Sequence, residues 1–245
     1  MRFLFAILFI VPFLLIGILY LGVEWLITKL FPGCRYKSDL RTLRLVQWAF
    51  KVILWISGTK VIVKGEENVP KDEPVLYIGN HRSIFDIIIT YSRCPGLTGY
   101  ISKAVIRKIP ILRLFMKRLH CQFMVREDIK QSFRVILDAI ESIKAGISIC
   151  IFPEGTRCKD PDPNAILPFK EGSFKIAQKT GCKIIPFAVK GTNEIFEDHV
   201  PWIKKKTVYL TYGAPVIIGE LPKEEQKILG SYCNRIVADM LKEQN

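Results

Sequence analysis

The residues best suited to chemistry lie in the stretch YIGNHRSIFDIIITY, at positions 77–91. His81 is one of three histidines in the chain, and Asp86 follows it by five positions. Residues five apart on a helix differ by about 500°, so the two side chains meet only if His81 precedes the helix and the chain curls back. Asp86 would then accept a bond from one ring nitrogen and leave the other free as a base. This pair is two thirds of a Ser-His-Asp triad, with a substrate hydroxyl as the missing nucleophile.

The same stretch also has a purely structural interpretation. Ser83 can cap the following helix, and Asp86, three residues on, completes a capping box. His81 is then an ordinary loop histidine. Under either interpretation the helix N-terminus stabilises Asp86 as an anion.

A second candidate segment is ICIFPEGTRC, at positions 149–158. An ordinary Pro-Gly turn with a surface ion pair would explain it. In a functional interpretation, the turn puts the Glu154 carboxylate and the Arg157 guanidinium on the same rim as His81. Arginine binds phosphate through paired donors, and Gly155 permits close approach of the backbone.

Two further cations follow strand-like runs. Lys103 comes after GYIS, and Arg126 ends QFMVR. Alone, each is typical of a solvated strand end. Together with Arg157 they place cations at three strand ends, a pattern that favours a phosphate monoester ligand.

Short β-branched runs alternate with helical ones after residue 60, which predicts an α/β fold with a mainly parallel central sheet flanked by helices. Functional groups in such domains gather at the carboxyl ends of the strands. The predicted strands are 60–65, 75–79, 99–102, 122–126, 148–152, 184–189 and 208–213. The predicted helices are 84–93, 104–119, 129–145, 172–180 and 223–242.

The N-terminal region predicts a membrane-embedded helical hairpin at residues 1–58, ahead of an α/β domain at 59–245. No charge occurs between Phe3 and Val23, and about 20 helical residues cross a bilayer core. A second amphipathic helix is expected at 40–57, after a Pro-Gly break. The hairpin either dips into one leaflet or spans the bilayer. A signal peptide and a buried core helix are the alternatives.

The distribution of charge predicts an orientation and an anionic partner. Five basic residues lie between Lys29 and Arg44 after the apolar segment, and only Arg2 precedes it, which predicts a membrane protein with its catalytic domain on the cytosolic face. The net charge of +13 favours nucleic acid, a membrane surface or a phosphorylated substrate. No nucleic-acid-binding motif is present, so nucleic acid is not an expected partner.

Other features predict structure more than chemistry. Seven cysteines without a C-x-x-C pair argue against a disulfide framework and a zinc site. His120 lacks an acid at a useful spacing, and we expect it to be structural or exposed. PWIKKK, at 201–206, is either a solvated loop or an additional membrane contact, since a tryptophan stands beside three lysines.

Four segments resemble, in order, the sequence blocks of glycerolipid acyltransferases, and specifically of 1-acylglycerol-3-phosphate acyltransferases. NHRSIFD (80–86) resembles their N-H-x-x-x-x-D block. The other segments are FMVR (123–126), FPEGTR (152–157) and KIIPFAVKG (183–191). The similarity extends from about Lys60 to Gly213.

The resemblance implies an enzyme that transfers a fatty acyl group from a thioester of acyl carrier protein or coenzyme A to the sn-2 hydroxyl of lysophosphatidic acid. The product is phosphatidic acid, in phospholipid biosynthesis, and no metal or cofactor is expected. His81 would be the general base and Asp86 its orienting partner. The implied substrate-binding residues are Lys103, Arg126, Glu154, Gly155, Thr156 and Arg157.

Departures from the family pattern leave more than one possible acceptor and more than one possible function. The second block usually has a glycine where His120 or Cys121 stands, and Arg113 replaces another glycine. The acceptor could therefore be glycerol 3-phosphate or another lysophospholipid. A non-catalytic protein that binds anionic lipid in the membrane is a third possibility.

Overall fold

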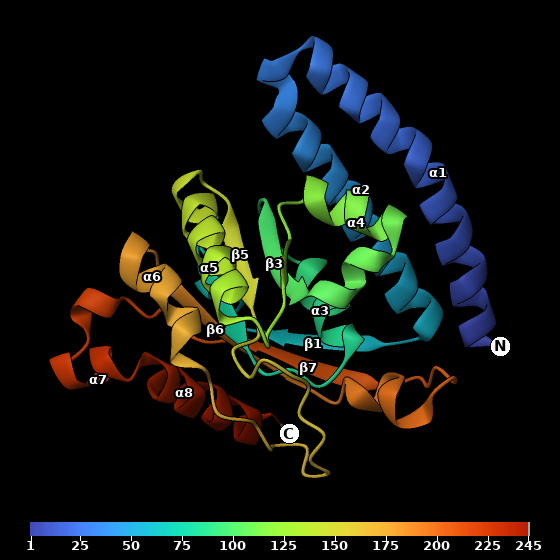
Figure 1. Cartoon of the computed structure of the whole chain (residues 1–245). Helices are drawn as coiled ribbons and strands as arrows, with labels where there is room; N and C mark the ends of the chain where they lie inside the picture. Colours follow the sequence, from blue (N-terminus) through green and yellow to red (C-terminus); the bar gives the residue numbers. More distant parts are fainter. Residues whose placement is uncertain (245) are drawn as a thin grey trace.

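A single seven-stranded sheet forms the centre of the molecule (Figure 1). The computed structural model describes residues 1–244. The strand order is β1-β7-β6-β2-β5-β3-β4. The strands are β1 (Lys60–Lys64), β2 (Leu76–Gly79), β3 (Thr98–Lys103), β4 (Gln122–Met124), β5 (Ser148–Ile151), β6 (Ile184–Lys190) and β7 (Thr207–Tyr212).

The sheet is mainly parallel, as predicted. β6, β2, β5, β3 and β4 run in one direction, whereas β7 pairs with β6 antiparallel and with β1 parallel. β2 therefore lies between two parallel neighbours, β5 and β6. The carboxyl ends of these three strands meet at one edge, where ligand-binding residues gather in α/β folds.

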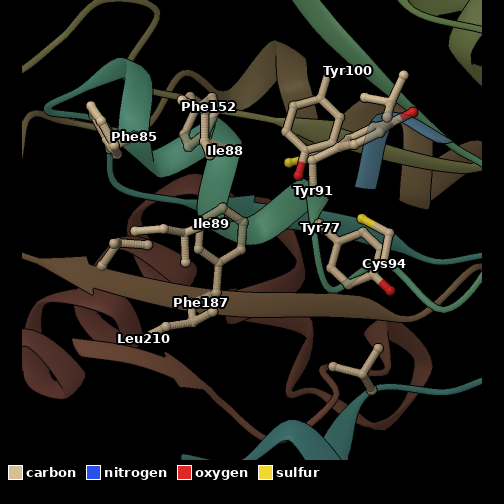
Figure 2. Packing of buried hydrophobic residues seen from close by; sticks show 14 of the residues in the cluster. Tyr77, Phe85, Ile88, Ile89, Tyr91, Cys94, Tyr100, Phe152, Phe187 and Leu210 are labelled. Atoms are coloured by element: carbon tan, nitrogen blue, oxygen red, sulfur yellow. The ribbon is translucent and has the colours of Figure 1, made fainter. Parts of the chain in front are cut away.

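Alternating side chains along the central strands build a core on each face of the sheet. Leu76 and Ile78 of β2 pack in a cluster with α5 (Ile129–Lys144), α6 (Lys175–Thr180) and α8 (Leu229–Glu243). Tyr77, between them, belongs to the opposite cluster. Figure 2 shows that second cluster, in which Ile89 of α3 (Ile84–Tyr91) lies beside Phe187 of β6.

The N-terminal hairpin consists of α1 (Arg2–Leu30) and α2 (Arg35–Ser57), with a short 3-10 turn between them. α1 is the one helix in residues 1–244 that is long and apolar enough to cross a membrane. It nevertheless lies along the domain, since Phe3 stacks on Phe196 and Arg118 donates to Thr28 near the other end. Midway, Gly17 is pressed so closely on Phe115 that an added Cβ would lie 2.6 Å from the ring.

Three predicted helices are each divided in two. The segment expected at 172–180 is a 3-10 helix over Glu171–Phe174 followed directly by α6 (Lys175–Thr180). The segment expected at 104–119 is a 3-10 helix over Ala104–Lys108 followed by α4 (Pro110–Arg118). Ile109 has φ −92° and ψ 104°, because the residue before a proline is driven out of helical geometry. The segment expected at 223–242 forms α7 (Lys223–Lys227) and α8, separated at Ile228.

Candidate active site

The strand–turn–helix connection after β2 holds His81 and Asp86 together at the carboxyl edge of the sheet. Asn80 fixes the start of this turn, because its fully buried amide exchanges two 2.8 Å hydrogen bonds with the backbone of Val189 on β6. His81 then precedes α3, and Asp86 lies in the first turn of that helix. The chain curls back as the spacing of five required.

Asp86 is both a helix cap and the partner of His81. Its Oδ2 atom lies 2.9 Å from His81 Nδ1 and accepts hydrogen bonds from the backbone N–H groups of Arg82 (2.7 Å) and Ser83 (2.8 Å). The hydroxyl of Ser83 accepts from the N–H of Phe85, which completes the cap. The cap and the His81–Asp86 contact therefore coexist, because one carboxylate oxygen accepts all three bonds.

The ring of His81 has one nitrogen free for chemistry. A carboxylate only accepts hydrogen bonds, so Nδ1 carries the proton in the pair and Nε2 is left as a base. Nε2 has no hydrogen-bond partner in the described part of the chain. The ring stacks on Phe152, with centroids 4.2 Å apart, and Phe152 in turn contacts Phe187 edge-on (Figure 2).

Glu154 holds the turn at His81 in place. Its Oε1 accepts from the backbone N–H of His81 at 2.6 Å, and its Oε2 accepts from that of Leu167 at 2.9 Å. Burial raises the pKa of the Glu154 carboxyl to about 7. The neighbouring Cys158 N–H donates to the carbonyl of His81 at 2.8 Å. The FPEGTR turn and the following Cys158 thus hydrogen-bond both the backbone N–H and the carbonyl of His81.

Two further residues that contact this turn lie between β6 and β7, and neither of them was predicted from the sequence. The fully buried Thr192 donates its hydroxyl proton to Asp86 Oδ1 at 2.5 Å. Glu197 accepts from the N–H of Ile84 at 2.8 Å and from the hydroxyl of Ser83. Both partners lie more than 100 residues away along the chain, beyond the range of local patterns.

A cavity of about 600 Å³ opens beside Phe152, between the ends of β3 to β5 and the helices α5 and α6. Arg126 and Gly155 both line it, as does Lys170, a cation that was not predicted. Gly155 has φ 74°, and an added Cβ there would lie 2.8 Å from Lys170 Nζ. The positive φ favours glycine at this position, and the absence of a Cβ leaves room for the end of the Lys170 side chain.

The remaining predicted residues lie near the carboxyl edge of the sheet but do not line that cavity. Arg157 lines a neighbouring hollow and pairs with Glu197 at 3.1 Å. Thr156 is exposed on the same turn. Lys103, at the end of β3, is exposed and pairs in register with Met124 of β4. Arg126 and Gly155 thus line the same cavity, whereas Arg157 lies near Ser83, with which it shares the partner Glu197.

His120 lies away from this site and has a structural contact. Its ring Nε2 is 3.0 Å from Asp39 on α2, and Asp39 also pairs with Arg118. His120 is the one non-glycine residue among 1–244 with positive φ, 57°. The left-handed backbone explains why glycine is usual at this point of the family pattern.

Comparisons with known proteins agree with this geometry. A family model described as Acyltransferase matches residues 60–190. A 1-acyl-sn-glycerol-3-phosphate acyltransferase of Borreliella burgdorferi is 32% identical over 189 residues, covering 76% of this chain and 74% of the relative. The Saccharomyces cerevisiae enzyme of the same name is 26% identical over 208 residues, which is 81% of this chain and 67% of that one.

The whole architecture also has a solved counterpart. The crystal structure of the 1-acyl-sn-glycerophosphate (LPA) acyltransferase PlsC from Thermotoga maritima superposes with a TM-score of 0.76 at 27% identity, covering 100% of this chain and 99% of that one. The hairpin is thus part of the shared fold, because the match covers the entire chain. The chain belongs to the acyltransferase family, as its four sequence blocks predicted.

Proposed function

We propose that this protein transfers a fatty acyl group from an acyl thioester to the sn-2 hydroxyl of 1-acylglycerol 3-phosphate and so makes phosphatidic acid. The observation that carries the proposal is the buried His81–Asp86 pair, whose free Nε2 lies at the carboxyl edge of the sheet. The names of the relatives support the acceptor. The donor would be a thioester of acyl carrier protein or coenzyme A, used as co-substrate without a metal or cofactor.

His81 acts as the general base in the proposed reaction. Its Nε2 takes the proton of the acceptor hydroxyl as that oxygen attacks the thioester carbonyl. The carbon–sulfur bond then breaks, and the leaving thiolate takes the proton from the imidazolium. Asp86 stabilises the transient imidazolium and holds the ring in the required tautomer. Base assistance of this kind contributes about 10²- to 10⁴-fold to the rate.

Arg126 and Lys170 are the best-placed ligands for the phosphate. Both line the cavity that Phe152 separates from the imidazole, and neither makes an ion pair with an acid among residues 1–244. Burial lowers the pKa of Arg126, although the guanidinium stays charged. A half-buried cation without an acid gains most from an anionic ligand. Lys103 and Arg157 extend the positive rim towards solvent.

The hairpin would attach the enzyme to the membrane that holds its substrate. Only Ala6, Gly17 and Glu24 of α1 are buried, and its outer face exposes a continuous row of large apolar side chains. Because both ends of α1 contact the domain, this face suits a helix lying in the plane of the bilayer interface. The excess of basic residues after α1 supports an orientation with the catalytic domain on the cytosolic side.

A panel of acceptors tests the proposed substrate. Purified protein in lipid vesicles would receive a labelled acyl thioester and, separately, 1-acylglycerol 3-phosphate, glycerol 3-phosphate or a lysophospholipid without a terminal phosphate. We expect labelled phosphatidic acid from the first acceptor and little product from the others. Preferred acylation of another acceptor would contradict the assigned substrate, and no transfer to any acceptor would contradict the proposed activity.

A further inference from the structure

The connection between β6 and β7 carries an exposed apolar and basic segment, residues 197–205, which we name the 197–205 loop. Val200 is 63% exposed and Trp202 is 58% exposed. Lys204 and Lys205 follow and are also exposed. Ile203, between these residues, points the other way and packs on the core. The loop is therefore anchored at its centre and presents its tryptophan and lysines outward.

The 197–205 loop lies beside the first turn of α1. Phe196, just before the loop, stacks on Phe3 with centroids 6.1 Å apart and planes within 12°. At Gly58, after the last turn of α2, an added Cβ would lie 3.4 Å from Lys205 Cγ and 3.5 Å from Arg2 Cζ. Figure 1 shows the same neighbourhood, with the N-terminus of α1 next to the segment that precedes β7.

The charges of the loop are available for an external anion. Lys206 pairs with Glu194, but neither Lys204 nor Lys205 forms an ion pair within residues 1–244. Arg2 adds a third cation at the same place. Exposed Leu4, Phe5 and Leu8 of α1 continue the apolar surface from here. A tryptophan and lysines next to an apolar helix face form the composition that binds a lipid interface.

We propose that the 197–205 loop is a second membrane contact, which binds anionic phospholipid headgroups through Lys204 and Lys205 and inserts Trp202 at the interface. It extends the apolar face of α1 towards the active site. The inference depends on the proposed attachment through α1, but not on the acyl-transfer reaction.

The loop is joined directly to the catalytic machinery. Glu197, at its start, bonds Ile84 and Ser83 at the N-terminus of α3 and pairs with Arg157. Thr192, five residues earlier, bonds Asp86. A loop that rests on the headgroups would therefore hold the mouth of the active site at the level where a lysophospholipid presents its phosphate.

Quenching of tryptophan fluorescence by brominated lipid tests the position of the loop. The chain has four tryptophans, so two triple Trp→Phe variants would retain either Trp202 or Trp25 alone. Trp25 is exposed on α1 and reports attachment of that helix. Both variants would be incorporated into vesicles of phosphatidylcholine and phosphatidylglycerol, with bromine on the acyl chains or without it.

We expect bromine to quench both tryptophans. Quenching of Trp25 without quenching of Trp202 would overturn the loop contact and leave the attachment through α1 intact. If neither tryptophan is quenched, the attachment and the loop contact both fail. The acyl-transfer proposal is judged separately, by turnover in detergent.

Charge reversal tests the role of the lysines. The double variant Lys204→Glu/Lys205→Glu would be distributed at equilibrium between phosphatidylglycerol-containing and pure phosphatidylcholine vesicles. Each lysine at an anionic surface is worth about fivefold, so we expect the preference for anionic vesicles to fall at least about 25-fold. Lys130→Glu/Lys223→Glu is the matched control, since both residues are exposed and lie on helices α5 and α7, away from α1 (Figure 1). Equal behaviour of the two double variants would refute the contact.

Discussion

Replacing Asp86 with asparagine separates its two roles. In the wild type, Oδ2 accepts from the His81 ring and two backbone N–H groups, and Oδ1 accepts from Thr192. An asparagine with its carbonyl oxygen at the Oδ2 position keeps the first three bonds. Its NH₂ group then faces the Thr192 hydroxyl, which can accept as well as donate. Asp86→Asn should therefore fold normally and lose only the negative charge.

The size of the effect follows from that loss of charge. A hydrogen bond to a charged group is worth about 1.5–3 kcal/mol, against about 0.5–1.5 kcal/mol between neutral groups. The imidazolium of the transition state would lose about 1–1.5 kcal/mol of stabilisation, which is roughly tenfold in rate. His81→Ala removes the base itself and should cost about 10²- to 10⁴-fold.

Single-turnover acylation of saturating 1-acylglycerol 3-phosphate measures the chemical step in each variant. Asp138→Asn, an isosteric change at an exposed position on α5, is the matched control and should retain wild-type rates. If Asp86→Asn also retains the wild-type rate, Asp86 is only a helix cap. A loss as large as that of His81→Ala in a folded variant would contradict the predicted orientation of the asparagine, with its carbonyl oxygen towards the His81 ring.

Further substitutions test the other parts of the site. Because burial raises the pKa of Glu154 from 4.5 to about 7, the folded protein binds a proton that the unfolded chain has lost. As the pH rises from 4.5 to 7, the free energy of unfolding of the wild type should therefore fall by about 3 kcal/mol relative to that of Glu154→Gln, measured by denaturant titration. The same pH dependence of stability in the two proteins would contradict this. His120→Ala should be about 1 kcal/mol less stable than His120→Gly, since only the positive φ separates them; equal unfolding midpoints would exclude backbone strain. Arg126→Gln and Lys170→Gln should each raise the acceptor KM about tenfold, whereas Lys144→Gln, on the exposed face of α5, should leave it unchanged; a wild-type KM in either cavity variant would remove that cation from the phosphate site.

Local patterns were sufficient to predict the sheet and the central pair. All seven strands lie where the β-branched runs predicted them, because buried parallel strands are short and apolar. The contact between His81 and Asp86 was also predictable, since five residues and one helix start fix its geometry. Pro110 was visible in the sequence as well, and its effect on Ile109 could have predicted the break before α4.

The supports of the site could not be predicted because they depend on the fold. Glu154 was expected at the substrate, yet both of its oxygens accept backbone N–H groups, one of them from His81. Thr192 and Glu197 reach the site only because β6 lies beside β2. Likewise, Asp39 on α2 provides the acid that no spacing around His120 indicated.

The most direct test of the account is acyl transfer from a labelled acyl thioester to 1-acylglycerol 3-phosphate by wild type and by His81→Ala. Vesicle binding of both proteins would show that the variant is folded and attached. The account predicts phosphatidic acid from the wild type and a rate at least about 100-fold lower from the variant. Comparable rates from the two proteins would contradict the assignment of His81 as the base.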